Sequence, residues 1–374
     1  MRKCNILSNL VSIVLIFNTI NAIGQNISAA TNQATTATTG QHTPVFANTM
    51  DDWPKTLPEL TSLRNHYTRQ YQNADGSIAA VISSAPIHYL KDGMFEAINP
   101  LIVPVNSSEY PYENTTNLME TYFGRSSKMG IKSVQAGAAI QEFLNTKMYW
   151  ERGGIETQTI WSADVPVQAV QNKAVYENLF GRIGAEFTIT AAKRELNYVI
   201  PDANALGSIP SGADFLVFSE EVILPQGWSY QISPRGGIAL IDPNGKSTYT
   251  YQHPLSKDAA TELTENNTLM EVQQDGQVLI VLTKVRTTWL LSAERQFPVY
   301  VDPTSTCTPD ASTYRTAQVN SGGGGGYGNI AVGYSGGYYR GYASFNITAI
   351  PNAATVSQVQ LYHTVYTTTG MTGG

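Results

Sequence analysis

The sequence is poor in cysteine and in charge. Its two cysteines in 374 residues are Cys4 and Cys307, and Cys4 precedes an apolar run typical of a secretory leader. Cys307 would then be alone, so no internal disulfide can form; we expect a linker residue, with an exposed thiol used for linkage as the alternative. Charged residues make up 14% of the chain, against about 25% in typical domains, and the net charge is −6. Because nothing here attracts phosphates, we expect no nucleic-acid partner.

Long apolar runs are missing after the N-terminus. The run Leu10–Phe17 is too short to span a bilayer comfortably, and no later stretch is long and apolar enough, so we expect no membrane span. Basic residues before this run and small residues after it are the pattern of a signal peptide. The pattern predicts residues 1–24 as a leader cut before Gln25, and a secreted or cell-surface protein. Residues 25–50, rich in Ala, Thr, Gln and Asn, are predicted to be a disordered spacer.

The sequence also lacks the spacing of common catalytic and metal sites. There is no GxSxG elbow and no HExxH helix. His88 is expected at a sheet position and His363 in a buried core position, because each lies among strand residues. Four histidines are scattered among different elements: His66, His88, His253 and His363. We therefore expect no enzyme, no cofactor and no metal, and we assign no catalytic residue.

Some motifs suggest chemistry but have simpler explanations. Asp92-Gly93 and Asp242–Gly245 lack the alternating oxygen ligands of a calcium loop and are predicted to be turns. Glu220-Glu221 are adjacent strand residues that face opposite ways, so we expect a solvated strand end. Gly322–Gly328 lacks the Lys-Ser/Thr of a phosphate-binding loop and is predicted to be a flexible loop. Five tyrosines of the same region either stack on sugar rings or fill a strand core: Tyr327, Tyr334, Tyr338, Tyr339 and Tyr342.

The residues that are abundant favour an all-β protein. Threonine, serine, asparagine, glycine and 21 tyrosines suit the strands and turns of a secreted β domain. Gly184–Thr190 alternates with period two, with Ala185, Phe187 and Ile189 on one face, and Arg194–Ile200 can return as its partner. A hairpin is predicted around Asp92-Gly93. Further strands are predicted at Phe215–Phe218, Ser229–Ile232, Ile238–Ile241, Val278–Leu282 and Trp289–Leu291.

The chain is predicted to divide into two domains near Pro303. Phe297–Val301 has the composition of a last strand, which Pro303 ends because it has no N–H for the ladder. Residues 51–303 are therefore predicted to form an antiparallel β-sandwich-like domain, with one short helix within Asp51–Leu63. Residues 304–374 supply too few strands for a sandwich of roughly seven or eight. We expect a truncated jelly-roll β-sandwich, either continued beyond this sequence or completed by another segment.

The order of several motifs is similar to that of a β-rich region near the N-termini of large secreted bacterial surface proteins, including those with Rhs/YD-type repeats. The second unit resembles the start of a DNRLRE-type β-sandwich, similar to carbohydrate-binding modules. The resemblance covers about residues 75 to 374 and brings no catalytic residues with it. The motifs of the first region are Tyr176–Phe180, Lys193–Glu195, Tyr249–Pro254, Lys257–Ala259 and Phe297–Pro303; those of the second are Tyr339–Phe345, Ile350-Pro351 and Val359–Tyr362.

These observations predict a secreted, non-enzymatic structural or adhesive module of a large bacterial surface protein. Two alternatives stay open. One is a carbohydrate-binding module that serves a polysaccharide-acting enzyme. The other is the N-terminal shell segment of an Rhs-type toxin-delivery protein. The expected partners are a polysaccharide or a cell-surface partner and downstream domains of the same polypeptide, and the sequence does not single out a binding residue.

Overall fold

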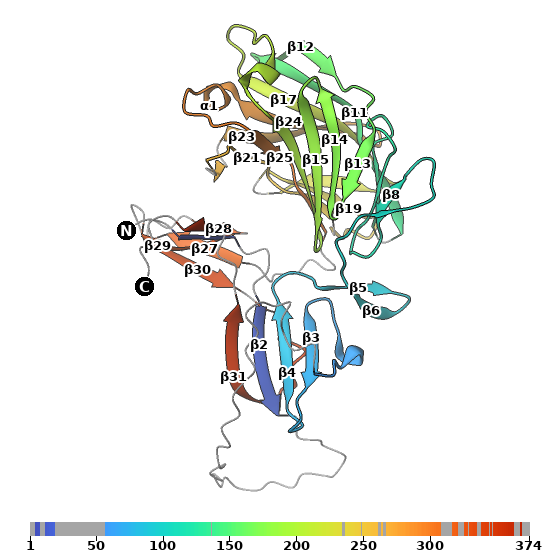
Figure 1. The fold of residues 1–374 in the computed structure, drawn as a ribbon, viewed down its shortest axis with the longest axis vertical. Coiled ribbons are helices and arrows are strands. Elements are labelled where there is room, and N and C mark those ends of the chain that lie inside the picture. Colours follow the sequence, from blue (N-terminus) through green and yellow to red (C-terminus); the bar gives the residue numbers. More distant parts are fainter. Residues whose placement is uncertain are drawn as a thin grey trace. The chain divides into compact units, whose positions relative to one another are not determined.

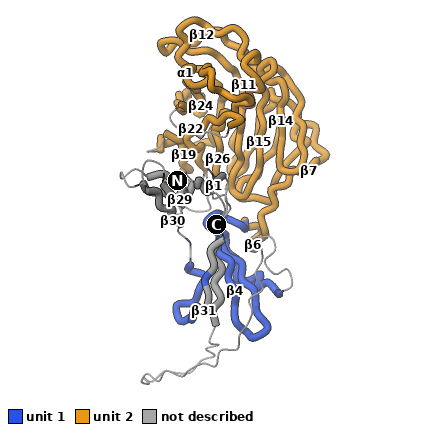
Figure 2. The backbone as a smooth tube through the Cα atoms, turned by 60° about the vertical axis from the view of Figure 1, so that its left-hand side comes forward, with its two compact units in different colours: residues 1–88, 313–374 blue, residues 89–312 orange. Residues whose placement is uncertain are grey.

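The computed structural model describes residues 57–307 except 136, 234–235, 248, 261–262 and 265–266, together with 4–7, 12–18, 316–320, 325–327, 329–334, 338–343, 345, 347–362 and 367–368. The chain forms two compact units (Figure 2). Unit 1 comprises residues 1–88 and 313–374, and unit 2 comprises residues 89–312. The predicted spacer lies outside the described residues, as does His363.

Unit 2 contains two large antiparallel sheets (Figure 1). Sheet I contains, in spatial order, β23 (Thr268–Asp275), β24 (Val278–Arg286), β17 (Phe215–Ile223), β11 (Ala138–Arg152), β10 (Ile131–Gln135), β9 (Glu120–Phe123), β8 (Tyr112–Asn114) and β7 (Val103–Pro104), and β12 (Ile155–Trp161) also pairs with β11. Sheet II contains, in spatial order, β13 (Val167–Val170), β14 (Lys173–Phe180), β15 (Ile183–Thr190), β16 (Lys193–Ile200), β26 (Ser305–Cys307), β20 (Tyr249–Tyr251), β19 (Ile238–Ile241) and β18 (Ser229–Ile232). Three short strands complete sheet II: β25 (Val299–Asp302), β21 (Leu255–Lys257) and β22 (Leu263–Thr264).

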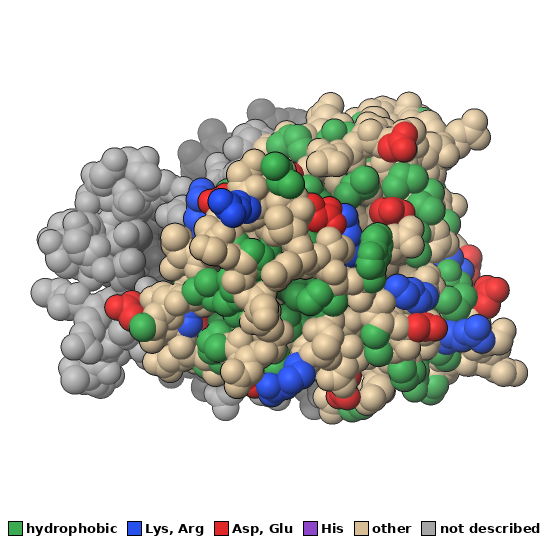
Figure 3. Space-filling view, turned by 90° about the horizontal axis from the view of Figure 1, so that it is seen from above, with side chains coloured by type: hydrophobic (Ala, Val, Ile, Leu, Met, Phe, Trp, Pro, Cys, Tyr) green, Lys and Arg blue, Asp and Glu red, His purple; other side chains and the backbone are tan. Residues whose placement is uncertain are grey.

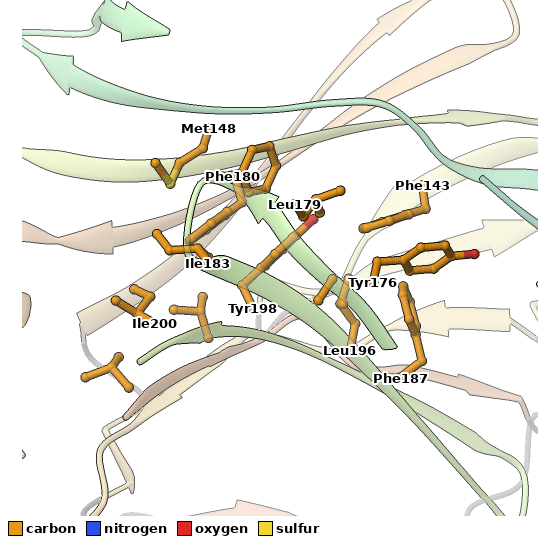
Figure 4. Close-up of a cluster of buried hydrophobic side chains, with 14 of the residues drawn as sticks. Phe143, Met148, Tyr176, Leu179, Phe180, Ile183, Phe187, Leu196, Tyr198 and Ile200 are labelled. Atoms are coloured by element: carbon orange, nitrogen blue, oxygen red, sulfur yellow. The ribbon is translucent and has the colours of Figure 1, made fainter. Parts of the chain in front are cut away.

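The two sheets pack face to face around a core that is rich in aromatic rings (Figure 4). Residues of β15 alternate between buried and half-buried positions, as their period of two predicts. Tyr198 of β16 stacks on Phe218 of β17 with ring centroids 4.1 Å apart, so one ring pair joins the two sheets. Phe143 of β11 packs edge-on against Phe187 of β15. The prediction of an all-β, sandwich-like fold is therefore confirmed.

The local turn predictions also hold. Asp92 and Gly93 both have positive φ, 49° and 79°, as a two-residue hairpin turn requires; they join β5 (His88–Lys91) to β6 (Met94–Ala97). In the Asp242–Gly245 turn, the Asp242 carboxylate accepts hydrogen bonds from the backbone N–H groups of Asn244 and Lys246, at 2.9 and 2.8 Å. The Asp242 carboxylate thus takes part in the hydrogen bonds that stabilise the turn.

Three local predictions are wrong. Trp289 lies in a helical turn, α1 (Thr287–Leu290), rather than a strand, because Thr287 donates its hydroxyl to the carbonyl oxygens of Ala213 and Asp214 and redirects the chain after β24. β25 ends at Asp302 as expected, but the chain returns to sheet II as β26. Cys307 is therefore a buried strand residue rather than part of a linker.

Unit 1 contains two antiparallel sheets in which N-terminal and C-terminal strands pair. One has the order β28 (Gly325–Tyr327), β27 (Thr316–Asn320), β30 (Tyr338–Ala343), β29 (Asn329–Tyr334), β1 (Cys4–Leu7) and β32 (Thr367–Thr368). The other has the order β3 (Thr68–Gln72), β4 (Ile78–Ser83), β2 (Ser12–Asn18) and β31 (Thr355–Tyr362). Segments of the predicted leader thus pair with strands of the predicted jelly roll. Part of the predicted glycine loop, Gly325–Tyr327, is a strand.

The division into units differs from the expected domains. Residues 57–88 lie in unit 1 rather than with the large β domain, and the chain leaves unit 2 after residue 312 rather than at Pro303. The short helix expected within Asp51–Leu63 corresponds in the described residues to η2 (Thr61–Leu63), a 3-10 turn.

Truncating a ring in the shared core is expected to weaken unit 2 strongly. Phe218→Ala removes the partner of Tyr198 and leaves a cavity, which costs about 3–5 kcal/mol of unfolding free energy. Urea unfolding followed by fluorescence measures this cost. Val170→Ala is the control, because Val170 is 72% exposed on β13 and its loss is expected to stay within about 0.5 kcal/mol. Equal costs for the two variants would contradict the stacked core.

Candidate functional site

The pair Glu220-Glu221 of β17 faces in two directions, as predicted, but it is not a solvated strand end. Glu220 is 6% exposed and points into the space between the sheets. Burial raises its pKa to about 8, and the nearby Glu142 carboxylate adds to this effect, while Arg194 opposes it. Glu221 lies on the outer face of sheet I, where its carboxylate accepts a hydrogen bond from the Asn145 amide at 2.7 Å.

Among the histidines that the structure describes, His66 and His88 lie close together in unit 1, with His66 Nδ1 3.0 Å from the His88 carbonyl oxygen. His88 begins β5 and is buried, as its expected sheet position implies, and its Nδ1 lies 2.6 Å from the carbonyl oxygen of Asn65. Burial lowers the pKa of His88 to about 4. Its Nε2 accepts a hydrogen bond from Arg69 Nε at 3.3 Å. A structural role in unit 1 therefore accounts for His88.

Cys307 is buried and offers no exposed thiol, whereas sugar binding by the five tyrosines stays a prediction. The Cys307 thiol donates a hydrogen bond to Gln135 Oε1 at 2.8 Å, and burial raises its pKa to about 12. A buried, protonated thiol is a poor nucleophile, so the alternative of an exposed linkage point is wrong for this structure. The tyrosines from Tyr327 to Tyr342 lie on or beside β28, β29 and β30, and their side chains lie outside the described part.

A buried polar layer crosses the core of unit 2. Glu142 of sheet I and Arg194 of sheet II form an ion pair at 2.8 Å, with side chains 2% and 4% exposed. Arg194 also donates to Ser133 Oγ at 2.7 Å and to Tyr249 Oη at 2.9 Å. Tyr249 and Tyr251 both donate to Glu142 Oε1. Every polar group of this layer thus has a partner within it.

Glu142 and Arg194 stabilise each other's ionised forms in this layer. Burial opposes ionisation of Glu142, but Arg194 together with the hydrogen bonds from Ser133 and Tyr249 outweighs it and lowers the pKa of Glu142. Tyr249 and Tyr251 of this layer also belong to a second buried cluster around Val222, which is distinct from the aromatic cluster around Phe187. Because its donors and acceptors pair with one another and are buried, we interpret the layer as structural.

An open groove on the outer face of sheet I is the better candidate for a functional site. It has a volume of about 510 Å³ and is lined by side chains of β11, β12, β17, β23 and β24. Its floor includes Tyr149, Ile280 and Leu282, which pack together over the sheet. Its rim carries glutamates, lysines, Asn145 and Gln273. The groove therefore combines a small apolar floor with a lining that is mostly polar and charged.

Trp161 forms an aromatic platform at one side of the groove. It is 60% exposed and lies directly opposite Lys147 in the pairing of β12 with β11. The Lys147 ammonium lies 5.0 Å from the centroid of the Tyr149 ring and 5.7 Å from that of Trp161. Lys147 also forms an ion pair with Glu156 at 2.5 Å. The cation is thus held between two rings and a carboxylate, which fixes the position of the indole.

The second lysine of the groove is also paired. Lys284 of β24 binds Glu151 at 2.7 Å and Glu271 at 3.0 Å. Burial lowers the pKa of Lys284, but the two carboxylates outweigh it and raise the pKa above its ordinary value. Burial likewise opposes ionisation of Glu156, but hydrogen bonds from Lys147 and Thr159 lower its pKa. The groove therefore presents both of its lysines in ion pairs, while Glu221 accepts a hydrogen bond from Asn145.

No sequence motif points directly to this groove. Its strands were foreseen in part, because Lys147–Trp150 and Thr157–Trp161 have strand composition. Sheet register between distant segments, however, sets which residues lie side by side. It places Lys147 opposite both Trp161 of β12 and Ser219 of β17. The sequence feature nearest to a signal is Trp161 itself, at the end of the strand-like run Thr157–Trp161.

Comparisons with known proteins give no family model and no curated protein that matches the chain. In the described residues, there is no helix long and apolar enough to cross a membrane. Among the same residues, no group of three or more histidine, cysteine, aspartate or glutamate side chains is placed to hold a metal ion. The groove must therefore be interpreted from its own chemistry.

The buried Glu220 is expected to make unit 2 less stable as pH rises. Its pKa is about 8 in the folded chain and about 4.3 in an unfolded chain. Between these values the folded state binds the proton and the unfolded state does not, so unfolding free energy falls with pH by up to about 1.4 kcal/mol per unit. Glu220→Gln is expected to remove this part of the slope, and chemical denaturation at pH 5 and pH 8 measures it.

Glu221→Gln is the matched control for this experiment. It lies one residue further along β17 on the outer face, and glutamine still accepts the hydrogen bond from Asn145. We expect it to keep the wild-type slope. Parallel slopes for wild type and Glu220→Gln would contradict a protonated, buried Glu220.

Proposed function

We propose that this chain is a non-enzymatic adhesive module of a secreted bacterial surface protein, and that the groove on sheet I binds a neutral glycan. The observation that carries the proposal is the Trp161 platform beside a groove of fixed hydrogen-bonding groups. Sugar rings present an apolar face, which stacks on an aromatic ring, and hydroxyl groups at their edges, which pair with carboxylates and amides. The groove offers both kinds of contact side by side.

The charge of the groove favours a neutral ligand. Its lining contains two lysines, Lys147 and Lys284, and four glutamates. Both lysines already bind glutamates, so an anionic sugar or a nucleic acid finds no free cation there and meets a net negative rim. Hydroxyl groups need no such cation, because they donate to paired carboxylates and accept from amides. A neutral, hydroxyl-rich polymer therefore fits best.

The same pairing supports a binding role rather than glycoside hydrolysis. A glycosidase needs one carboxyl group with a raised pKa that can protonate the leaving oxygen. In the groove, hydrogen bonds lower the pKa of Glu156, while Glu151 and Glu271 are bound to Lys284. Two described carboxyl groups have raised pKa values: Glu220 is buried between the sheets, and Asp302 is half-buried at the end of β25. Neither of these two groups lines the groove.

The surface character of unit 2 agrees with an extracellular adhesive module. Figure 3 shows acidic and basic side chains scattered among other residues on the face viewed, without a continuous patch of one sign. Together with the predicted leader and the resemblance to bacterial surface proteins, this supports a secreted protein whose recognition depends on local shape rather than on a strong electric field.

Removal of the indole is expected to weaken glycan binding. Trp161→Ala deletes the stacking platform, so affinity for a bound neutral polysaccharide is expected to fall about tenfold or more. Affinity electrophoresis of the purified chain through gels containing neutral plant, algal or bacterial polysaccharides measures this as a loss of retardation. Asn145→Ala, which removes a hydrogen-bonding group of the rim, is expected to cause a smaller loss.

Ile155→Ala is the matched control. Ile155 lies on the same strand as Trp161 and is 69% exposed, but it does not line the groove. Its removal is expected to leave retardation unchanged. If no neutral polysaccharide retards the wild-type chain, or if Trp161→Ala is retarded as strongly as the control, glycan binding in this groove is wrong.

A further inference from the structure

A second aromatic cluster lies on the same outer face of sheet I. Tyr110 and Tyr122 meet edge to face with ring centroids 6.3 Å apart. Lys132 of β10 lies over both rings, at 4.9 Å from the Tyr110 centroid and 4.1 Å from the Tyr122 centroid. The Tyr122 hydroxyl donates to Glu120 at 2.6 Å. The arrangement is that of the groove platform, where Lys147 lies between Tyr149 and Trp161.

The two clusters face the same way. Lys132 pairs with Gln141 of β11, and Gln141 in turn pairs with Ile223 of β17. At the groove, Lys147 pairs with Ser219 of β17. Ile223 and Ser219 are four residues apart on one strand, so their side chains lie on the same face. The Tyr110 hydroxyl, 3.4 Å from Gln141 Oε1, places its ring over that face as well.

The clusters also lie on the same side of β11. Both β10 and β12 pair with the edge of β11 that is opposite to β17, β10 with its first half and β12 with its second half. Ile223 marks the position of the Lys132 cluster on β17, and Ser219 marks that of the groove platform. These two residues are four positions apart, which corresponds to about 14 Å at the usual rise along a strand. The separation is therefore longer than one sugar ring and short enough for a chain of a few rings.

Lys132 differs from the groove lysines in one respect. Lys147 and Lys284 bind glutamates, whereas the two tyrosine rings are the contacts that the described part of the chain gives the Lys132 ammonium. An ammonium group has three donors and no acceptor. Those donors are available to the hydroxyl or ring oxygens of a ligand that lies over Tyr122.

We infer that the Tyr110, Tyr122 and Lys132 cluster is a second glycan subsite, and that the ligand of sheet I is an extended neutral chain that runs along β11 from Trp161 to Tyr122. The inference rests on the proposed glycan-binding function and names its ligand class: an internal stretch of a polysaccharide rather than a single terminal sugar. Gln141 lies beside the Tyr110 ring, and Asn145 lies between the two platforms along β11; both supply amide groups for the sugar units.

Chain length is the variable that tests this inference. Isothermal titration of the full chain with neutral gluco-oligosaccharides and manno-oligosaccharides, from disaccharide to octasaccharide, is expected to show affinity that rises with length and then levels off. Tyr122→Ala is expected to remove the gain with length, a loss of about tenfold for the octasaccharide, while disaccharide binding stays unchanged. Lys132→Met keeps the packing on the rings but deletes the donors, and a loss of severalfold is expected for the octasaccharide alone.

Two controls separate recognition from folding and from the groove itself. Tyr122→Phe keeps the ring and is expected to keep the length dependence, and unfolding midpoints show whether each variant is folded. Trp161→Ala is expected to weaken disaccharide and octasaccharide alike. If wild type binds all lengths equally, or if Tyr122→Ala keeps the length dependence while Trp161→Ala loses affinity, the second subsite is wrong and the groove stands. If wild type binds no oligosaccharide of the series, both proposals fail.

Discussion

The ion pair between Glu142 and Arg194 is the interaction on which the arrangement of unit 2 depends. It joins β11 of sheet I to β16 of sheet II inside the core, where each charge is almost completely buried. A buried pair offsets its desolvation only when further hydrogen bonds satisfy the remaining lone pairs and donors. Ser133, Tyr249 and Tyr251 supply them. We interpret the pair as setting the position of one sheet relative to the other. Sliding one sheet over the other would leave two buried charges unpaired, whereas purely apolar sheets could slide at little cost in free energy.

The same strand that carries Glu142 into the core carries the groove lysine on its outer face. The register of β11 against β17 shifts twice between Gln141 and Lys147, and Phe143 and Asn145 have positive φ, 58° and 45°. Such irregularities bend a strand and redirect its side chains. Here they allow Glu142 and Phe143 to lie inside in succession and still return Lys147 to the outer face. The buried pair and the binding groove are thus two consequences of one irregular strand.

The sequence predicted what depends on neighbouring residues. The alternation of Ala185, Phe187 and Ile189, and the Asp242–Gly245 turn, follow from local periodicity and turn chemistry. Burial of Glu220 and Cys307 could not be foreseen in this way, because the partners that surround them come from other sheets and distant strands. Both residues sit where local rules predict exposure, a strand end and a linker. Tertiary pairing overrode those rules at each position.

The contrast between two groups of aromatic residues shows why the candidate site was harder to predict than the fold. The tyrosines from Tyr327 to Tyr342 are conspicuous because they lie close together in the sequence. Closeness in the sequence does not by itself place rings on one face of a sheet. A sugar platform needs rings and polar groups that share one face across several strands. Trp161, Tyr149 and Lys147 meet that requirement because β12 pairs with β11 in a particular register. Recognition on a β-sheet is therefore a property of cross-strand neighbours, and a single sequence shows it only after its pairing is known.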